Sequence, residues 1–318
     1  MEKVTEIIDA IKRSKNVLVC GHVRPDGDCI GSALAMRRIC EKLGKNADAV
    51  CDIESDKPTA FFYLPDYDGF CTTRFEDYDL LIAVDCGDEK RLGEYRKYLD
   101  SAKNSINIDH HPTNNGYAKI NRVDTQASST CEIIYNLFKD SRIIDKDIAE
   151  MLYTGLSTDT GHFMHANTDA EVFAIAAALC GYGLDIGRIN HDLYCNNSAN
   201  RMRLTARAID SIRLHADGRI AVMTITLDDL KACGCDTSDT EGLIDYASSI
   251  SGVGISIAMC ERPGNVFRVS LRSVKADVSA VAGVFGGGGH KLASGCIING
   301  NRYDVAEKVI KAATAALS

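Results

Sequence analysis

The chain has 318 residues, of which 45% are hydrophobic and 25% are charged. This composition is typical of a folded protein with enough chain for about two domains, and it excludes a disordered or collagen-like protein. There are 44 Asp and Glu against 36 Lys and Arg, which gives a formal charge of −8. That acidity argues against long duplex nucleic acid as a partner, because duplex binding requires a positive surface.

The cysteines and the apolar segments do not indicate secretion or membrane insertion. The 13 cysteines are odd in number and lack the paired Cys-x-x-Cys spacing of a zinc site, so we expect reduced and mostly buried thiols. The N-terminal residues 1–15 are charged throughout, unlike a secretory signal. The longest apolar stretch, 172–180, is far shorter than the roughly 20 residues that span a membrane. We therefore expect a cytoplasmic protein that does not contact a membrane.

Apolar segments at helix and strand spacing predict an α/β domain in the first half of the chain. The expected helices follow the i, i+3, i+4 rule and lie at 4–11, 29–43, 129–139, 147–156 and 169–179. The expected strands are short apolar segments at 16–20, 79–84 and 105–108. Short apolar strands separated by helices indicate a parallel sheet, whose ligand sites lie beyond the carboxyl ends of the strands.

The sequence pattern changes after the first half. Residues 184–215 are mixed and charged, which predicts a helical linker, and strand-like alternation with turn signals follows at 219–227, 254–260 and 265–271. We predict a parallel-sheet domain at 1–183, the linker at 184–215 and a smaller α/β domain at 216–318.

Acidic and imidazole side chains follow each of the three strands expected in the first domain. His22, Asp26 and Asp28 come just after the first strand, Asp85 follows the second, and Asp109, His110 and His111 follow the third. Asp159 adds a carboxylate from a polar segment after a helix. Because the carboxyl ends of parallel strands meet at one edge of the sheet, we expect a shared pocket formed by His22, Asp26, Asp28, Asp85, His110 and Asp159.

These side chains suit divalent metal ions. Carboxylate and imidazole ligands without thiolate favour Mn²⁺, Mg²⁺ or Fe²⁺ over structural zinc. Two ions roughly 3.5 to 4 Å apart, bridged by a carboxylate, can activate a water and stabilise both oxygens of an in-line phosphoryl displacement. A single acidic turn could instead cap a helix, but the combination of three strand ends favours a two-metal phosphoesterase.

Five segments carry a resemblance to a known family. Residues 21–28 (GHVRPDGD), 84–88 (VDCGD), 109–111 (DHH) and 157–163 (STDTGHF) resemble, in order and spacing, the four motifs of the DHH phosphoesterase superfamily. Residues 285–295 (FGGGGHKLASG) resemble the signature of the DHH-associated C-terminal substrate domain. The resemblance implies a stand-alone hydrolase that degrades very short RNA (nanoRNA) to mononucleotides and dephosphorylates 3′-phosphoadenosine 5′-phosphate (pAp).

The same resemblance implies residue roles. His22, Asp26 and Asp85 would hold one ion, and Asp28, Asp85, His110 and Asp159 the other, with Asp85 bridging. The ions would be two Mn²⁺, with Mg²⁺ or another divalent ion as alternatives. Asp109 would orient a neighbouring imidazole and His111 would act at the scissile phosphate, so Asp85, Asp109 and His111 form the expected catalytic set.

Substrate contacts are expected mainly in the second domain. The glycine run offers unobstructed backbone N–H groups to a phosphate, and the candidates there are Gly287, Gly288, Gly289 and His290. Residues 261–291 contain five basic and two acidic residues, a local charge of +3, and Arg272 is similar to a family arginine that reaches a substrate phosphate. His165, after the fourth motif, is a further candidate.

Three functional readings remain open from the sequence. The first is hydrolysis of short single-stranded RNA and pAp; the second keeps the chemistry but takes pApA or cyclic di-AMP as the substrate. The third is a nucleotide-binding regulator without activity, which the complete set of ligand residues disfavours. The sequence does not determine the oligomeric state and is compatible with a homodimer.

Overall fold

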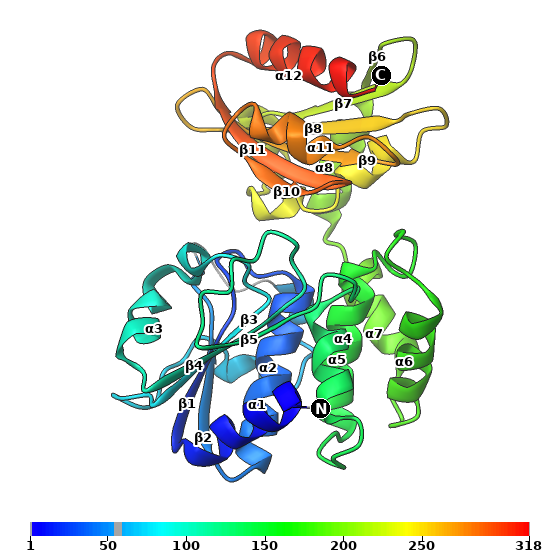
Figure 1. The fold of residues 1–318 in the computed structure, drawn as a ribbon. Helices are drawn as coiled ribbons and strands as arrows, with labels where there is room; N and C mark the ends of the chain where they lie inside the picture. Colours follow the sequence, from blue (N-terminus) through cyan, green and yellow to red (C-terminus); the bar gives the residue numbers. More distant parts are fainter. Residues whose placement is uncertain (1, 54–58, 318) are drawn as a thin grey trace. The chain divides into compact units, whose positions relative to one another are not determined.

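The structure is a computed structural model that describes residues 2–53 and 59–317. The chain divides into two compact units, Met1–Asn196 and Asn197–Ser318 (Figure 1). Both units combine helices with a sheet, so the predicted mixed α/β class is confirmed.

The first unit is built on a parallel sheet. Its described strands form a five-stranded sheet in the order β2-β1-β3-β4-β5, and every neighbouring pair is parallel. The strands are β1 (Asn16–Cys20), β2 (Asn46–Val50), β3 (Leu80–Val84), β4 (Asn104–Asp109) and β5 (Ile120–Val123). The three inner strands β1, β3 and β4 are the ones predicted, and nearly all of their residues are buried, as a sheet covered on both faces requires.

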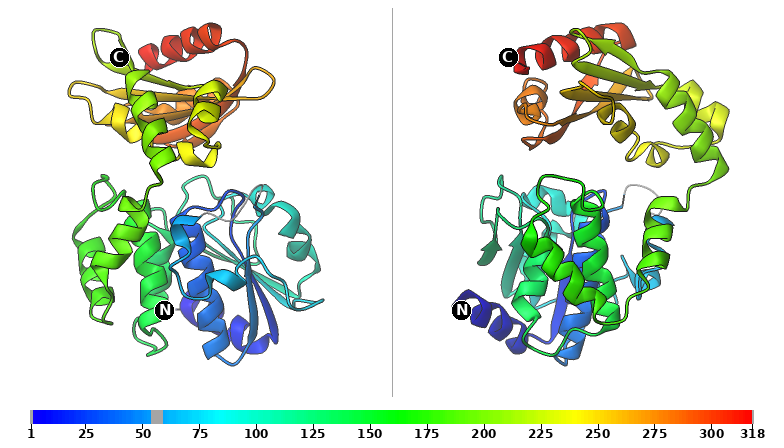
Figure 2. Two further views of the ribbon diagram at one scale, coloured as in Figure 1. Left: turned by 180° about the vertical axis from the view of Figure 1, so that it is seen from behind. Right: turned by 90° about the vertical axis from the view of Figure 1, so that its right-hand side faces the viewer.

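Helices cover both faces of this sheet (Figure 2). The larger core joins the sheet to α1 (Glu2–Arg13), α2 (Gly27–Lys42), α4 (Thr130–Phe138), α5 (Lys146–Asp159) and α6 (Ala170–Cys180). A smaller core on the opposite face includes Leu18, Leu81 and Leu92 and lies under η3 (Glu89–Arg96) and α3 (Lys97–Ser101). Shorter helical segments complete the unit: η1 (Thr59–Phe61), η2 (Tyr67–Gly69), α7 (Ile186–Asn190) and the π-helical turn η4 (His191–Cys195).

Two helices begin at the carboxyl edge of the sheet, and each has a side-chain cap at its N-terminus. The side chain of Asp26 accepts a hydrogen bond from the N–H of Cys29 and caps α2. Ser129 caps α4 by accepting from the N–H of Glu132, whose carboxylate in turn accepts from Ser128. These caps fix the positions from which both helices contribute to the site below.

The second unit contains a mixed sheet between two helical layers. Within its described residues the sheet has six strands in the order β10-β11-β9-β8-β7-β6, and only the β7–β8 pair among them is parallel. The strands are β6 (Arg213–His215), β7 (Ile220–Ile225), β8 (Ile255–Arg262), β9 (Val266–Ser273), β10 (Gly288–His290) and β11 (Ala293–Asn299).

The helices of this unit pack in two layers. One core includes residues of α11 (Val278–Gly283) and α12 (Arg302–Ala316), and the other includes residues of α8 (Ala199–Asp210), α9 (Leu227–Cys233) and α10 (Ile244–Ser248), with η5 (Ser238–Thr240) between these last two. Helix α8 lies within the segment 184–215 and buries Leu204 and Ala208 in the second core. Among the residues that the structure describes, no helix combines the length and apolar character needed to cross a membrane.

Candidate metal centre

The side chains predicted to bind metal converge at the carboxyl edge of the first sheet. His22 follows β1, Asp85 follows β3, and Asp109 ends β4 with His110 and His111 directly after it. These three strands are neighbours in the sheet. Asp85 has a φ of 52°, in the left-handed region that aspartate tolerates better than most residues. An outlier of this kind directly after a buried strand is typical of a functional position.

The two oxygens of Asp85 face different imidazoles. Its Oδ2 lies 3.3 Å from Nε2 of His22, and its Oδ1 lies 3.5 Å from Nε2 of His110. The carboxylate is almost completely buried, with 2% of the residue exposed. A carboxylate placed between two imidazoles in this way can bridge two cations.

Hydrogen bonds fix which nitrogen of each imidazole is available to a metal. Nδ1 of His22 lies 2.7 Å from the carbonyl oxygen of Val23, and Nδ1 of His110 lies 3.3 Å from that of Ala127. A carbonyl can only accept, so each Nδ1 carries the proton and donates. Nε2 is thereby left as the ligand atom, an arrangement common among metal-binding histidines.

The carboxylate of Asp28 is held by the first residues of α4. The backbone N–H of Thr130 donates to Oδ2 across 2.6 Å, and the N–H of Cys131 donates to Oδ1 across 2.9 Å. The hydroxyl of Thr130 also donates to Oδ1 of Asp85 across 3.2 Å. The sequence reasoning missed Thr130, although its neighbour Ser129 caps this helix by accepting from the N–H of Glu132.

Asp26 and Asp159 are the last two predicted metal ligands, and their side chains are more exposed than that of Asp85. Oδ1 of Asp26 caps α2, whereas its Oδ2 faces Nε2 of His22 at 3.9 Å. Asp159 is the last residue of α5, and its Oδ2 lies 3.4 Å from Nε2 of His110. Asp28, His110 and Asp159 each offer a ligand atom within 4.8 Å of the other two. The structure thus brings all six predicted ligands together.

The electrostatics of the cluster fit bound cations. Burial, followed by the charge of Asp85, raises the pKa of Asp28 to about 7. Burial, followed by the charge of Asp28, also raises the pKa of Asp159, which lies at the negative end of α5. Burial alone would raise the pKa of Asp85, but His22 and the two other imidazoles outweigh it and lower that pKa. Buried carboxylates so close together need positive charge, and their oxygen and nitrogen donors fit divalent ions.

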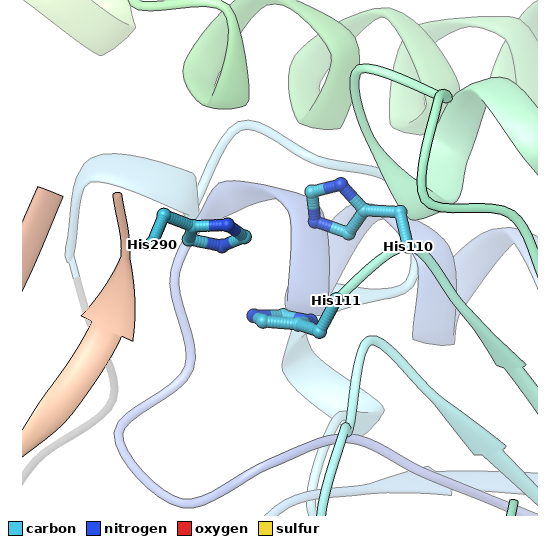
Figure 3. Close-up of side chains that lie close together, drawn as sticks. All are labelled: His110, His111 and His290. Atoms are coloured by element: carbon cyan, nitrogen blue, oxygen red, sulfur yellow. The ribbon is translucent and has the colours of Figure 1, made fainter. Parts of the chain in front are cut away.

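His111 is oriented by Asp109 rather than by the metal ligands. Its Nδ1 lies 2.8 Å from Oδ1 of Asp109. Asp109 is fully buried, and its other oxygen, Oδ2, accepts a hydrogen bond from the side chain of Asn114. The rings of His110 and His111 are inclined by 65° at the end of β4 (Figure 3). Burial alone would lower the pKa of His111, but the hydrogen bond to Asp109 and the charge of Asp85 raise it above its ordinary value.

His165 lies outside this cluster of ligands. It is exposed on the loop after α5, where its ring occupies the space that a Cβ on Gly161 would need. A substrate role for His165 therefore remains a proposal.

The predicted substrate residues of the second unit share one part of its sheet. Arg272 on β9 pairs with Ala293 on β11, which pairs with His290 on β10, the residue also labelled in Figure 3. Directly paired residues of antiparallel strands point to the same face. In the glycine run, the N–H groups of Gly286 and Gly287 donate to carbonyls of α11. These two N–H groups are therefore already used, whereas Gly288, Gly289 and His290 lie on the edge strand β10, which pairs with β11.

Comparison with known proteins decides the family. Residues 16–156 match the N-terminal domain of the DHH family, and residues 217–318 match the DHHA1 domain. The bifunctional oligoribonuclease and PAP phosphatase NrnA of Thermus thermophilus is 31% identical over 319 residues, covering 98% of this chain and 93% of that protein. The chain belongs to the DHH family.

Two further proteins match over almost the same length. The Bacillus subtilis protein of the same name as the Thermus one is 28% identical over 313 residues, covering 96% of both chains. A crystal structure of an exopolyphosphatase-related protein from Bacteroides fragilis superimposes with a TM-score of 0.91 at 25% identity, covering 98% of this chain and 95% of that one. The resemblance stated from the sequence motifs is confirmed.

Proposed function

We propose that this DHH-family protein is a two-metal phosphoesterase that hydrolyses short oligoribonucleotides to mononucleotides and removes the 3′-phosphate of pAp. The observation that carries the proposal is the placement of Asp85, whose two oxygens face His22 and His110 separately. The substrates are inferred from relatives that are named for both activities and match nearly the whole chain.

The ligands divide into two sets that share Asp85. His22, Asp26 and Asp85 would hold one ion, and Asp28, Asp85, His110 and Asp159 the other. We propose Mn²⁺ because the donors are carboxylate oxygens and imidazole nitrogens. When bound, the ions supply an acidified water as nucleophile and positive charge at the phosphoryl oxygens.

His111, oriented by Asp109, would protonate the leaving oxygen. Asp109 holds Nδ1 of His111, so Nε2 is the atom that can act on substrate. As the water oxygen bonds to phosphorus, the bond from phosphorus to the ribose oxygen breaks, and protonated His111 gives that oxygen its proton from Nε2. The raised pKa of His111 keeps it protonated over a wider pH range than an ordinary histidine.

The second unit supplies the substrate contacts in this proposal. Arg272, on the same row of the sheet as His290, would pair with a phosphate, and the N–H of Gly288 or Gly289 that points away from β11 would donate to it. The formal charge of −8 keeps long duplexes out of the proposed substrates. We propose a cytoplasmic location, where short RNA and pAp arise, and a homodimer as the assembly to test by light scattering.

A substrate assay tests the proposal. Purified protein with Mn²⁺ is expected to release mononucleotides from a labelled dinucleotide and phosphate from pAp, and Asp85→Asn is expected to remove both activities. Asp100→Asn, at an exposed aspartate on α3, is the matched control and should keep them. Activity that survives both chelation and Asp85→Asn would contradict the mechanism. Offering pApA and cyclic di-AMP in the same assay separates the alternative substrates.

A further inference from the structure

A thiol lies among the oxygen and nitrogen donors of the centre. Cys29 is completely buried in the first turn of α2, and its Sγ accepts a hydrogen bond from the backbone N–H of His22 at 3.2 Å. One ligand atom each from Cys29, His22 and Asp85 lies within 4.8 Å of the other two. All three residues are buried. The sequence alone suggested a site without thiolate, so this neighbour changes the chemistry that the centre offers.

The glycine at the start of the first motif leaves room for this thiol. A Cβ built on Gly21 would lie 2.3 Å from Sγ of Cys29, which is far inside contact distance. The absence of a side chain at residue 21 therefore lets the thiol sit next to His22.

The three donors are close enough for one tetrahedral ion. With zinc bonds of about 2.0 to 2.3 Å, ligand atoms around one ion lie roughly 3.3 to 3.8 Å apart. Nε2 of His22 and Oδ2 of Asp85 are already 3.3 Å apart. A sulfur and a nitrogen or oxygen on one such ion lie about 3.5 Å apart, so the thiol needs to come closer by at most about 1.3 Å, because all pairs lie within 4.8 Å. Thiolate with imidazole is a donor set that zinc and cadmium prefer over manganese.

We propose that Cys29, His22 and Asp85 form a second, soft-metal site that takes Zn²⁺ or Cd²⁺ and thereby inhibits the hydrolase. On binding, a metal–sulfur bond forms, the thiol proton goes to solvent, and water leaves the ion, with no change of oxidation state. The inhibition rests on the proposed function, because the soft ion would occupy His22 and Asp85, which the catalytic ions require. The binding itself does not depend on any activity.

Another pair of thiols provides the control. Sγ of Cys51 and Sγ of Cys71 lie 3.5 Å apart, so this pair is a competing site for a soft metal. Cys71→Ser disturbs that pair and leaves the contacts between Cys29 and His22 in place.

Cadmium binding to the full chain without added Mn²⁺ tests the site directly. Titration with Cd²⁺ is expected to produce the ultraviolet charge-transfer band of a cadmium–thiolate bond. Cys29→Ser and Cys29→Ala should each lose the contribution of one such bond, whereas Cys71→Ser should retain it. Circular dichroism checks that the variants are folded. A band that is unchanged in both folded Cys29 variants, or lost only in Cys71→Ser, would overturn the site.

The inhibition is measured separately on pAp hydrolysis with Mn²⁺. We expect Zn²⁺ to inhibit the wild type at concentrations at least tenfold lower than those needed for Cys29→Ala. Equal sensitivity of the two proteins would overturn the regulatory part. If no substrate is hydrolysed but the cadmium band depends on Cys29, the proposed function fails and the soft-metal site stands.

Discussion

The hydroxyl of Thr130 donates a hydrogen bond to Oδ1 of Asp85 across 3.2 Å. The backbone N–H of the same residue donates to Oδ2 of Asp28. One residue at the start of α4 therefore orients two carboxylates that come from different elements of the fold, and both are proposed metal ligands. A hydrogen bond to a ligand fixes its direction and its basicity, and loss of such a partner typically costs 10- to 100-fold in metal affinity.

Thr130→Val is expected to weaken Mn²⁺ binding by about tenfold, because valine keeps the shape and the N–H but lacks the hydroxyl. Calorimetric titration with Mn²⁺ measures the affinity. The hydrogen bond of the N–H to Asp28 remains, so the number of ions bound should not change. Thr130→Ser restores the hydroxyl and should bind Mn²⁺ like the wild type. Equal affinities for the valine and wild-type proteins would show that the hydroxyl has no positioning role.

Asp109→Asn is expected to lower kcat by roughly 10²- to 10⁴-fold, the usual range for loss of general acid catalysis. It should also change the pH profile. The hydrogen bond to Asp109 is the main factor that raises the pKa of His111, so the variant has a lower pKa at His111. If protonated His111 is the acid, activity is present below this pKa and lost as pH rises through it. The basic limb of the kcat profile should therefore move to lower pH.

If Asp109→Asn keeps the basic limb of the wild-type kcat profile at the same pH, the titrating acid is a group other than His111. Measurement over the same pH range with the dinucleotide and with pAp shows whether both substrates use the same acid.

Removal of metal should lower the thermal stability of the first unit. An ion that binds only the folded chain stabilises it by about 2.7 kcal/mol at a free concentration 100 times its Kd. For a unit of this size that corresponds to a shift of about 5 to 10 °C. Thermal unfolding with Mn²⁺ and with a chelator measures the difference. The shift should be much smaller in Asp85→Asn, and a shift of the same size there would place the stabilising ions elsewhere.

Substitution of two neighbouring glycines of the second unit can distinguish a structural role from a role in substrate binding. A Cβ on Gly287 would lie 2.2 Å from the carbonyl oxygen of Gly295, whereas one on Gly288 would meet no atom of the described chain within 4 Å. Gly287→Ala is therefore expected to lower the melting temperature. Gly288→Ala should keep it but raise KM by about tenfold, since a methyl group would obstruct a phosphate at an N–H worth about 1.5 to 3 kcal/mol. An unchanged KM in Gly288→Ala would remove this residue from the substrate contacts.

The inner strands and the clustering of the candidate ligands could be predicted from sequence because their signals are local. β1 and β3 are short apolar segments, and His22 and Asp85 follow them directly. The edge strand β2 contains Asp48, which reads as a surface residue. In the fold Asp48 is 1% exposed, and Arg74 and Tyr78 donate hydrogen bonds to it. Partners that are about 26 to 30 residues away in the chain leave no pattern within the strand itself.

The parts of the site that escaped prediction depend on distant contacts. The N–H groups that hold Asp28 belong to residues 102 and 103 positions later in the chain. The approach of Cys29 to His22 depends on the turn at Gly21 and on the first turn of α2, neither of which determines the direction of a side chain from sequence alone. Residue types at strand ends therefore identify the candidate ligands, whereas the groups that orient them become visible only in three dimensions.

All six proposed ligands lie between residues 22 and 159, within the first unit. During synthesis this set is complete before the second unit, Asn197–Ser318, is made. The proposed metal ligands are therefore synthesised before the strands of the second unit that carry the proposed substrate contacts. The proposed metal site and the proposed substrate contacts are thus separated in the order of synthesis as well as in the sequence.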